Sequence, residues 1–190
     1  MTDLMRSDEI KSLVRDAYRD VTGGGREAVE AIYGADLLQG VPDAAVERSL
    51  GVANHMPHAD LREGETVLDI GCGAGIDCVI AGRKVGPTGR VIGLDFLPEM
   101  LERARKTFAE AGLTNCETLE GEMEAIPLPD ASVDAVISNG VINLSPRKTR
   151  VFAEIFRVLR PGGRMCVSDL TIVEEELPPE VLVHPAAWAG

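Results

Sequence analysis

The chain has 190 residues, with 19 basic residues against 31 acidic ones, so its formal net charge is −12. Such a surface repels phosphate backbones, and an aromatic content of 4% leaves little for stacking on bases, so nucleic acid is not expected as a partner. A hydrophobic fraction of 45% with 26% charged residues is typical of one globular domain.

The sequence also bears on the compartment. No apolar run approaches the roughly 18 residues that a membrane span requires, so no membrane is expected as a partner. Residues 1–9 lack the basic start and apolar stretch of a signal peptide. Four cysteines without a CxxC pair are not a disulfide framework, and they predict reduced thiols in the cytoplasm.

Residues 1–60 are predicted to form an N-terminal helical cap. Apolar residues recur at helical spacing after Ser7, and the three glycines Gly23–Gly25 interrupt that helix. Two further helices are predicted over Arg26–Leu38 and Pro42–Leu50, because Pro42 suits a first helical position and Gly51 follows the end.

Residues 61–173 alternate between short apolar runs and helical patterns, which predicts a parallel sheet covered on both faces. The fold class is therefore α/β, a Rossmann-like doubly wound parallel sheet that lacks the last strands, with N-terminal helices in front. The predicted strands are Thr66–Ile70, Arg90–Leu94, Glu117–Leu119, Val133–Ile137 and Arg164–Leu170, and helices are predicted from about residue 75 to Lys84, over Pro98–Ala111 and over Pro146–Leu159.

Residues 174–190 are predicted to be an acidic, proline-containing tail. The fifth strand then has an unpaired apolar edge. Either the chain forms a homodimer along that edge, or it is a shortened form of a longer protein.

The strongest motif is the turn Asp69–Gly75 between the first strand and its helix. Its glycines let the main chain turn sharply and let a ligand approach the backbone. The third glycine is Gly75, whereas a dinucleotide fingerprint would place it at position 76. Asp95 follows the second strand, where an acid can accept hydrogen bonds from both ribose hydroxyls.

This acidic–xGxGxG turn with an acid after the second strand resembles the class I S-adenosylmethionine-dependent methyltransferases. The resemblance implies that the turn holds the methionine portion of S-adenosylmethionine, that Glu122 accepts from the adenine amino group and that the Met123 backbone faces the ring. A sulfonium cation suits an acidic pocket. The implied cofactor-binding residues are Asp69, Gly71, Cys72, Gly73, Gly75, Asp95, Phe96, Glu122, Met123 and Asn139.

The stretch Ser138–Pro146, SNGVINLSP, is similar to the SNCVINL segment of arsenite methyltransferases. Gly75–Cys78 and Ser168-Asp169 are similar too, and the resemblance covers about Pro42 to Gly190. In that family cysteine thiolates hold trivalent arsenic, whose lone pair attacks the methyl group. Thiolates suit this soft centre, and Cys78 is the implied catalytic residue, on a helix start where the dipole lowers a thiol pKa.

The sequence departs from this pattern at the substrate cysteines. Gly140 stands where the family has the central cysteine, Val52 and Ala53 stand where an upstream cysteine is common, and a further cysteine would fall beyond Gly190. Cys78 alone cannot chelate arsenic, and Gly140→Cys is expected to strengthen arsenite binding without full activity.

The remaining cysteines and histidines give weaker signals. Cys72 is interpreted as a small buried residue of the turn, and Cys116 and Cys166 as packing residues. His55 and His58 form an HxxH pair without a third ligand, so no metal is expected.

Two functions follow. The first is a methyltransferase that moves a methyl group from S-adenosylmethionine to trivalent arsenic or another small acceptor. The alternative is a truncated, catalytically impaired module that binds the same cofactor.

Overall fold

A computed structural model describes residues 12, 14–16, 24–47, 49 and 52–171. Five strands form one parallel sheet in the order β3-β2-β1-β4-β5, which confirms the predicted α/β doubly wound class. The strands are β1 (Thr66–Ile70), β2 (Arg90–Asp95), β3 (Cys116–Glu120), β4 (Val133–Asn139) and β5 (Leu159–Ser168). Four strands were predicted almost residue for residue.

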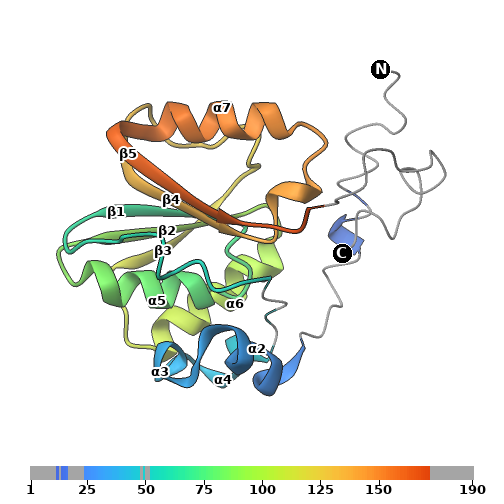
Figure 1. Cartoon of the computed structure of the whole chain (residues 1–190), viewed down its shortest axis with the longest axis vertical. Helices are drawn as coiled ribbons and strands as arrows, with labels where there is room; N and C mark the ends of the chain where they lie inside the picture. The colour runs from blue at the N-terminus through green and yellow to red at the C-terminus, as the bar shows by residue number, and fades with distance from the viewer. Residues whose placement is uncertain (1–11, 13, 17–23, 48, 50–51, 172–190) are drawn as a thin grey trace.

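Helices cover both faces of the sheet (Figure 1). Two of them, α5 (Ile76–Val85) and α6 (Pro98–Glu110), lie on one face, and α7 (Lys148–Val158) lies on the other. α5 is buried almost all round because it is enclosed between the sheet and the N-terminal helices. α7 is amphipathic and leaves Phe156 84% exposed on its outer face.

The N-terminal helices lie beyond α5 and α6 (Figure 1). They are shorter than predicted: α2 (Gly25–Tyr33), α3 (Ala35–Leu38) and α4 (Asp43–Val46). The expected helix over Arg26–Leu38 is broken at Gly34, whose φ of 78° leaves the helical region. The helix expected before it lies largely outside the described residues.

The sheet separates two apolar cores. The first joins the N-terminal helices, α5 and α6 to one face of the sheet, and it includes Val29, Tyr33, Met56, Val79, Leu101 and Ile137. The second lies under α7 and includes Leu68, Ile92, Ile126, Val151 and Ile155. The described residues between 24 and 60 therefore share a core with those between 61 and 171, although the sequence separates them into two regions.

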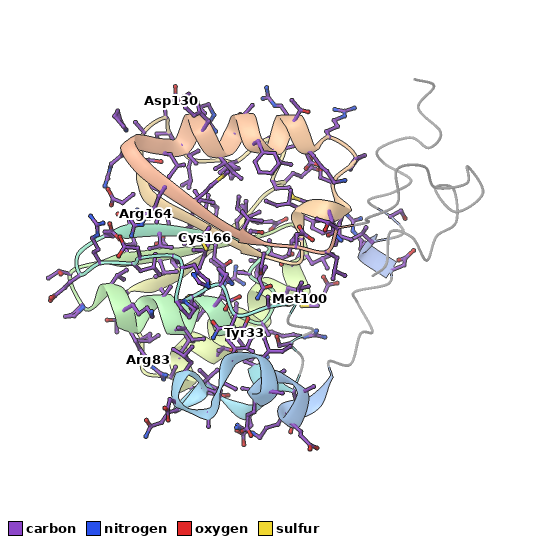
Figure 2. All side chains as sticks on the ribbon, in the orientation of Figure 1. Tyr33, Arg83, Met100, Asp130, Arg164 and Cys166 are labelled. Carbon is purple, nitrogen blue, oxygen red and sulfur yellow. The ribbon has the colours of Figure 1, made fainter. Side chains whose placement is uncertain are left out.

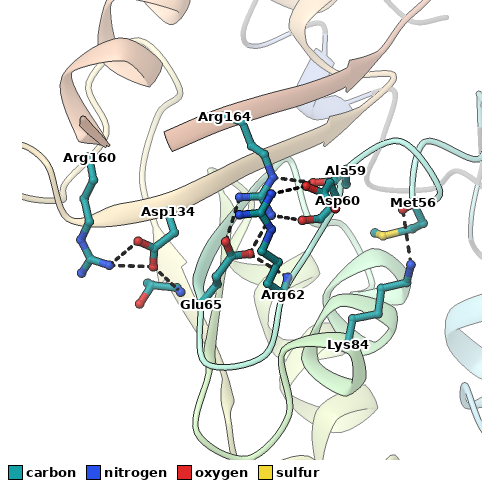
Figure 3. A network of polar contacts seen from close by, with 10 residues as sticks. Met56, Ala59, Asp60, Arg62, Glu65, Lys84, Asp134, Arg160 and Arg164 are labelled. Carbon is teal, nitrogen blue, oxygen red and sulfur yellow. Dashed lines mark hydrogen bonds and ion pairs between the residues drawn. The ribbon is translucent and has the colours of Figure 1, made fainter. Parts of the chain in front are cut away.

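An ion-pair network fixes the chain where it enters β1 (Figure 3). Arg164 of β5 donates to both carboxylate oxygens of Glu65, at 2.8 and 2.7 Å, and to the carbonyl of Ala59 at 2.9 Å. Asp134 accepts from the backbone N–H of Thr66 at 2.8 Å. This network lies at the amino end of the strands and leaves the carboxyl end to the glycine turn.

β5 begins at Leu159 instead of Arg164, so the strand follows directly after helix α7. Pro161 therefore lies within the strand. Within the described part of the chain no strand pairs with the outer edge of β5. Met165 and Leu170 are exposed there. The predicted tail, residues 174–190, lies outside the described residues.

Candidate functional site

The strand order reverses between β1 and β4, and ligands of open α/β sheets bind at this switch point, beyond the carboxyl ends of the strands. The glycine turn leaves β1 at this point. The backbone N–H groups of Gly71 and Cys72 both donate to the carbonyl of Leu94, at 2.8 and 3.0 Å, which ties the turn to β2. Gly71, Gly73 and Gly75 all have positive φ, of 73°, 52° and 89°.

The three glycines differ in what surrounds them. A Cβ on Gly71 would lie 2.5 Å from the side chain of Val141, and one on Gly75 would lie 2.7 Å from the ring of Phe108. A Cβ on Gly73 would meet nothing within 4 Å. Protein atoms therefore pack against the first and third glycines, and the middle one borders open space where a ligand can approach the main chain.

Asp95, at the end of β2, is joined to this turn. One carboxylate oxygen accepts from the Gly73 N–H at 3.0 Å and the other from the Leu97 N–H at 3.0 Å. Burial raises the pKa of Asp95, although these backbone donors lower it. Because a carboxylate has about four lone-pair sites, Asp95 can still accept from a ligand.

The segment that carries Glu122 and Met123 is brought to the same end of the sheet. The N–H of Gly121 donates to the carbonyl of Asp95 at 3.1 Å. The Glu122 side chain is exposed, and Met123 is half-buried against the core under α7. Phe96 follows Asp95, and the guanidinium carbon of Arg15 lies 5.9 Å from the centre of its ring.

Asp69, at the start of the glycine turn, and Cys78, in α5, form a buried hydrogen-bonded pair. Cys78 donates to the Asp69 carboxylate at 3.2 Å, and both side chains are buried. The expectation that the helix start lowers the pKa of Cys78 is wrong: its hydrogen bond with Cys72, its burial and the Asp69 charge raise that pKa well above the usual value. Burial, with the nearby Asp77 charge, likewise raises the pKa of Asp69 well above its usual value.

Sequence reasoning missed Tyr33 and Asp77. The Tyr33 hydroxyl lies 3.1 Å from a carboxylate oxygen of Asp77, in the first turn of α5, and Figure 2 places Tyr33 between the N-terminal helices and the sheet. Asn139 donates to the Tyr33 hydroxyl at 2.8 Å and to the Ala53 carbonyl at 2.8 Å, and its oxygen accepts from Ser168 at 2.7 Å. The only sequence feature that pointed to Asp77 was its place as an acid in the first turn of a helix. Its contact with Tyr33 could not be predicted, because α2 is far from α5 in the sequence.

The structure thus brings the implied cofactor residues to one end of the sheet, with Asn139 held by protein groups. The other signals do not add a metal site. His55 is buried with no hydrogen-bond partner on either ring nitrogen, and His58 is exposed. Among the described residues no three His, Cys, Asp or Glu side chains form a cluster suited to a metal ion.

The residues present fit the implied cofactor. Gly73 offers open space beside the main chain, the buried Asp95 carboxylate accepts from its N–H, and the buried Asp69 lies at the start of the same turn. Buried carboxylates are stabilised by a cationic ligand, which the sulfonium and ammonium groups of S-adenosylmethionine provide.

No helix in the described parts of the chain has the length and apolar character to cross a bilayer.

A family model described as a methyltransferase domain matches residues 61–189. An arsenite methyltransferase of Halobacterium salinarum is 45% identical over 158 residues, which are 83% of this chain and 40% of the relative. A demethylmenaquinone methyltransferase of Listeria monocytogenes is 38% identical over 110 residues, 57% of this chain and 46% of the relative.

Among solved structures, the crystal structure of an arsenic(III) S-adenosylmethionine methyltransferase from Chlamydomonas reinhardtii has a TM-score of 0.69 and 37% identity. The match covers 92% of this chain and 54% of that structure. The chain spans less than half the length of the two curated relatives described. These matches confirm the resemblance stated from the sequence and imply S-adenosylmethionine as the cofactor. The chain belongs to the methyltransferase-domain family.

Proposed function

We propose that this chain binds S-adenosylmethionine over the glycine turn and transfers its methyl group to trivalent arsenic or another small acceptor. The observation that carries this proposal is the open space at Gly73, bordered by a turn whose other glycines are closed by protein atoms. The similarity to arsenite methyltransferases supports the acceptor.

When bound, S-adenosylmethionine supplies an electrophilic methyl group on a sulfonium centre. In this proposal Asp95 accepts from the ribose hydroxyls, Asp69 offsets the positive charge of the methionine portion, and Glu122 accepts from the adenine amine. Because the acceptor's own lone pair attacks the methyl group, the chain needs to align the two reactants and exclude water, and it needs no general base for arsenic.

The burial and the hydrogen bonds of the cysteine thiols favour the alternative, a module that binds the cofactor without turnover. Cys78 is fully buried and hydrogen-bonded to Asp69, and Gly140 carries no thiol. Cys116 and Cys166 donate to the carbonyls of Cys78 and His55, each at 3.5 Å. Cys72 and Cys78 are buried and Cys116 and Cys166 are half-buried, so none of the described cysteines is fully exposed to arsenic.

Calorimetry with S-adenosylhomocysteine tests the cofactor site. Asp95→Ala is expected to weaken binding by about 1–3 kcal/mol, because the ribose hydroxyls lose their acceptor. Glu117→Ala is the matched control, since it removes an exposed acid from the neighbouring strand. Failure of the wild-type chain to bind at sub-millimolar concentration would overturn the cofactor proposal, and equal loss in both variants would overturn the role of Asp95.

A second assay separates turnover from binding. Arsenite, glutathione and S-adenosylmethionine are incubated with the chain, and methylated arsenic is measured by chromatography. Product supports the methyltransferase, whereas bound cofactor without product supports the module or a different small acceptor.

We also propose a cytoplasmic location and a homodimer formed along the outer edge of β5. All four cysteines lie within the described residues and are free, which suits a reducing compartment. No strand of the described residues pairs with the outer edge of β5, and Met165 is exposed beside it, which supports self-association. The net charge of −12 supports a small-molecule substrate over a nucleic acid.

A further inference from the structure

The loop between β3 and β4 has no regular secondary structure over residues 121–132, so its backbone groups need partners from elsewhere. Two side chains of α7 supply them. Glu154 accepts from the backbone N–H of Ile126 at 3.0 Å, and Arg157 donates to the carbonyl of Ile126 at 2.8 Å and to that of Leu128 at 2.7 Å. Both polar backbone groups of Ile126 are therefore bound to α7.

Glu154 and Arg157 also bind each other. Arg157 donates through Nη2 at 2.7 Å and through Nε at 3.1 Å to the two carboxylate oxygens of Glu154, which is the fork geometry that only arginine provides. The bonds with Arg157 lower the pKa of the buried Glu154 and keep it ionised. Arg157 reaches Asp130 at 2.8 Å as well, at the end of the loop, where Figure 2 labels it beside α7.

A second attachment holds the loop nearer to β3. Ser145 donates to the carboxylate of Glu124 at 2.6 Å, and Arg150 of α7 donates to the Glu124 carbonyl at 3.1 Å. On its other side the loop is joined to β2 by the bond from Gly121 to Asp95. Glu122 and Met123 thus lie between an attachment to the ribose side of the site and several attachments to α7.

We propose that Glu154 and Arg157 are positioning residues that set the place of Glu122 and Met123, and so determine how the chain recognises the purine of its cofactor. This inference rests on the proposed function, because it concerns the same site. The two side chains bond to the loop and to each other, and neither is among the residues assigned to the ligand. Their effect is transmitted by the main chain between Met123 and Leu128, which belongs to no helix or strand.

The test compares two ligands that differ only at the purine. S-adenosylhomocysteine carries the amine that Glu122 accepts from, and S-inosylhomocysteine carries a carbonyl oxygen there. Calorimetry gives both dissociation constants, and their ratio reports the position of Glu122. Glu122→Gln is the reference for lost discrimination, because its amide can donate to the carbonyl.

Arg157→Lys keeps the charge and removes the fork. We expect it to weaken S-adenosylhomocysteine binding by about tenfold, the equivalent of one lost charge-assisted hydrogen-bond pair, and to move the ratio toward that of Glu122→Gln. The matched control is Arg160→Lys, which changes an arginine whose Nη1 donates to both carboxylate oxygens of Asp134, near the far end of the sheet (Figure 3). It is expected to leave both constants unchanged.

A folded Arg157→Lys protein that loses thermal stability but keeps the wild-type ratio would overturn the inference, since a purely structural role predicts that result. If Arg157→Lys does not fold, Glu154→Gln keeps an acceptor for the N–H of Ile126 but loses the ion pair with Arg157, and the same ratio decides the matter. A wild-type chain that binds neither ligand would instead contradict the proposed function.

Discussion

Three buried acids surround the glycine turn: Asp69, Asp77 and Asp95 are each no more than 9% exposed. Burial is the largest cause of the raised pKa of each carboxyl group. An acid whose pKa is raised in the folded state binds protons more tightly there than in the unfolded chain. Stability without ligand therefore falls as the pH rises from the ordinary aspartate value of 3.8 through the raised values.

A cationic ligand reverses this dependence. Binding the ammonium and sulfonium groups requires ionised carboxylates, so affinity rises over the same pH interval in which the stability of the free chain falls. We expect the increase in Tm caused by S-adenosylmethionine to grow with pH above 3.8, measured by scanning fluorimetry. Asp69→Asn should flatten the profile. A shift that is independent of pH in the wild-type chain would contradict a cation beside Asp69.

The glycines of the turn separate stability from binding. Gly71→Ala places a Cβ against Val141 and strains a positive φ, so we expect the free energy of unfolding to fall by roughly 2–4 kcal/mol. Gly73→Ala meets no protein atom and costs only about 1–2 kcal/mol for its backbone, yet it fills the space assigned to the ligand. Urea denaturation measures the stability of both variants, and calorimetry measures their binding of S-adenosylhomocysteine. Undiminished binding by Gly73→Ala would contradict the assignment of the space at Gly73 to the ligand.

At the scale of single residues, the sequence placed residues on helices, strands and turns but did not give their side-chain contacts. It placed Cys78 at the start of a helix, which is correct. It could not show that Cys72 and Asp69 contact the same thiol, because neither spacing nor composition gives a side-chain contact across a turn. For the same reason the sequence did not predict a role for Tyr33, since its hydroxyl reaches Asp77 only after the N-terminal helices have packed in the folded chain.

At the scale of elements, continuous apolar runs predicted β1, β2 and β4 well because buried parallel strands leave little choice of residue. The pattern of β3 is weaker because this strand lies at the end of the sheet and none of its residues is fully buried. The junction of α7 with β5 was less predictable. Pro161 reads as a break, but an edge strand tolerates a residue without an N–H, and the pairing with β4 shifts register between Val133 and Ala135. That tolerance depends on which strand is at the edge, and a local pattern does not contain this information.

The loop after β4 gives a prediction at the same scale. Gly140 has a φ of 72°, and a Cβ there would lie 2.4 Å from a methyl carbon of Val52. Gly140→Cys should therefore lower the free energy of unfolding by roughly 2–4 kcal/mol, through strain and displacement of Val52.

Adding Val52→Ala should recover part of that loss, because the displaced methyl groups are removed. Urea denaturation of both variants measures the recovery, and arsenite titration shows whether the new thiol adds affinity. If Gly140→Cys alone kept the wild-type free energy of unfolding, the Val52 side chain would be able to move aside without destabilising the fold.

At the scale of the whole molecule, the sequence predicted a helical cap over residues 1–60 followed by a sheet domain, and among the described residues the helices α2 to α4 precede the sheet. The cap nevertheless contributes Val29, Tyr33 and Met56 to the core on one face of the sheet. A composition boundary near residue 60 cannot reveal such sharing, because packing between distant segments leaves no local signature.

Self-association belongs to this scale too. If two copies pair along β5, light scattering after size-exclusion chromatography should give twice the mass of one chain. Met165→Lys, which places a charge beside the open edge, should shift the population to monomer. Glu117→Lys on β3 is a control at the other end of the sheet. A wild-type monomer at high concentration would exclude this homodimer.

The amide of Asn139 joins segments that are distant along the chain: it bonds the hydroxyl of α2's last residue, the backbone at Ala53 and the end of β5. A helix tethered in this way cannot detach while the strands stay folded unless those bonds break first. The amino-terminal layer and the sheet should consequently melt as one cooperative unit, with slow amide exchange in both, so any opening that admits a methyl acceptor must be local.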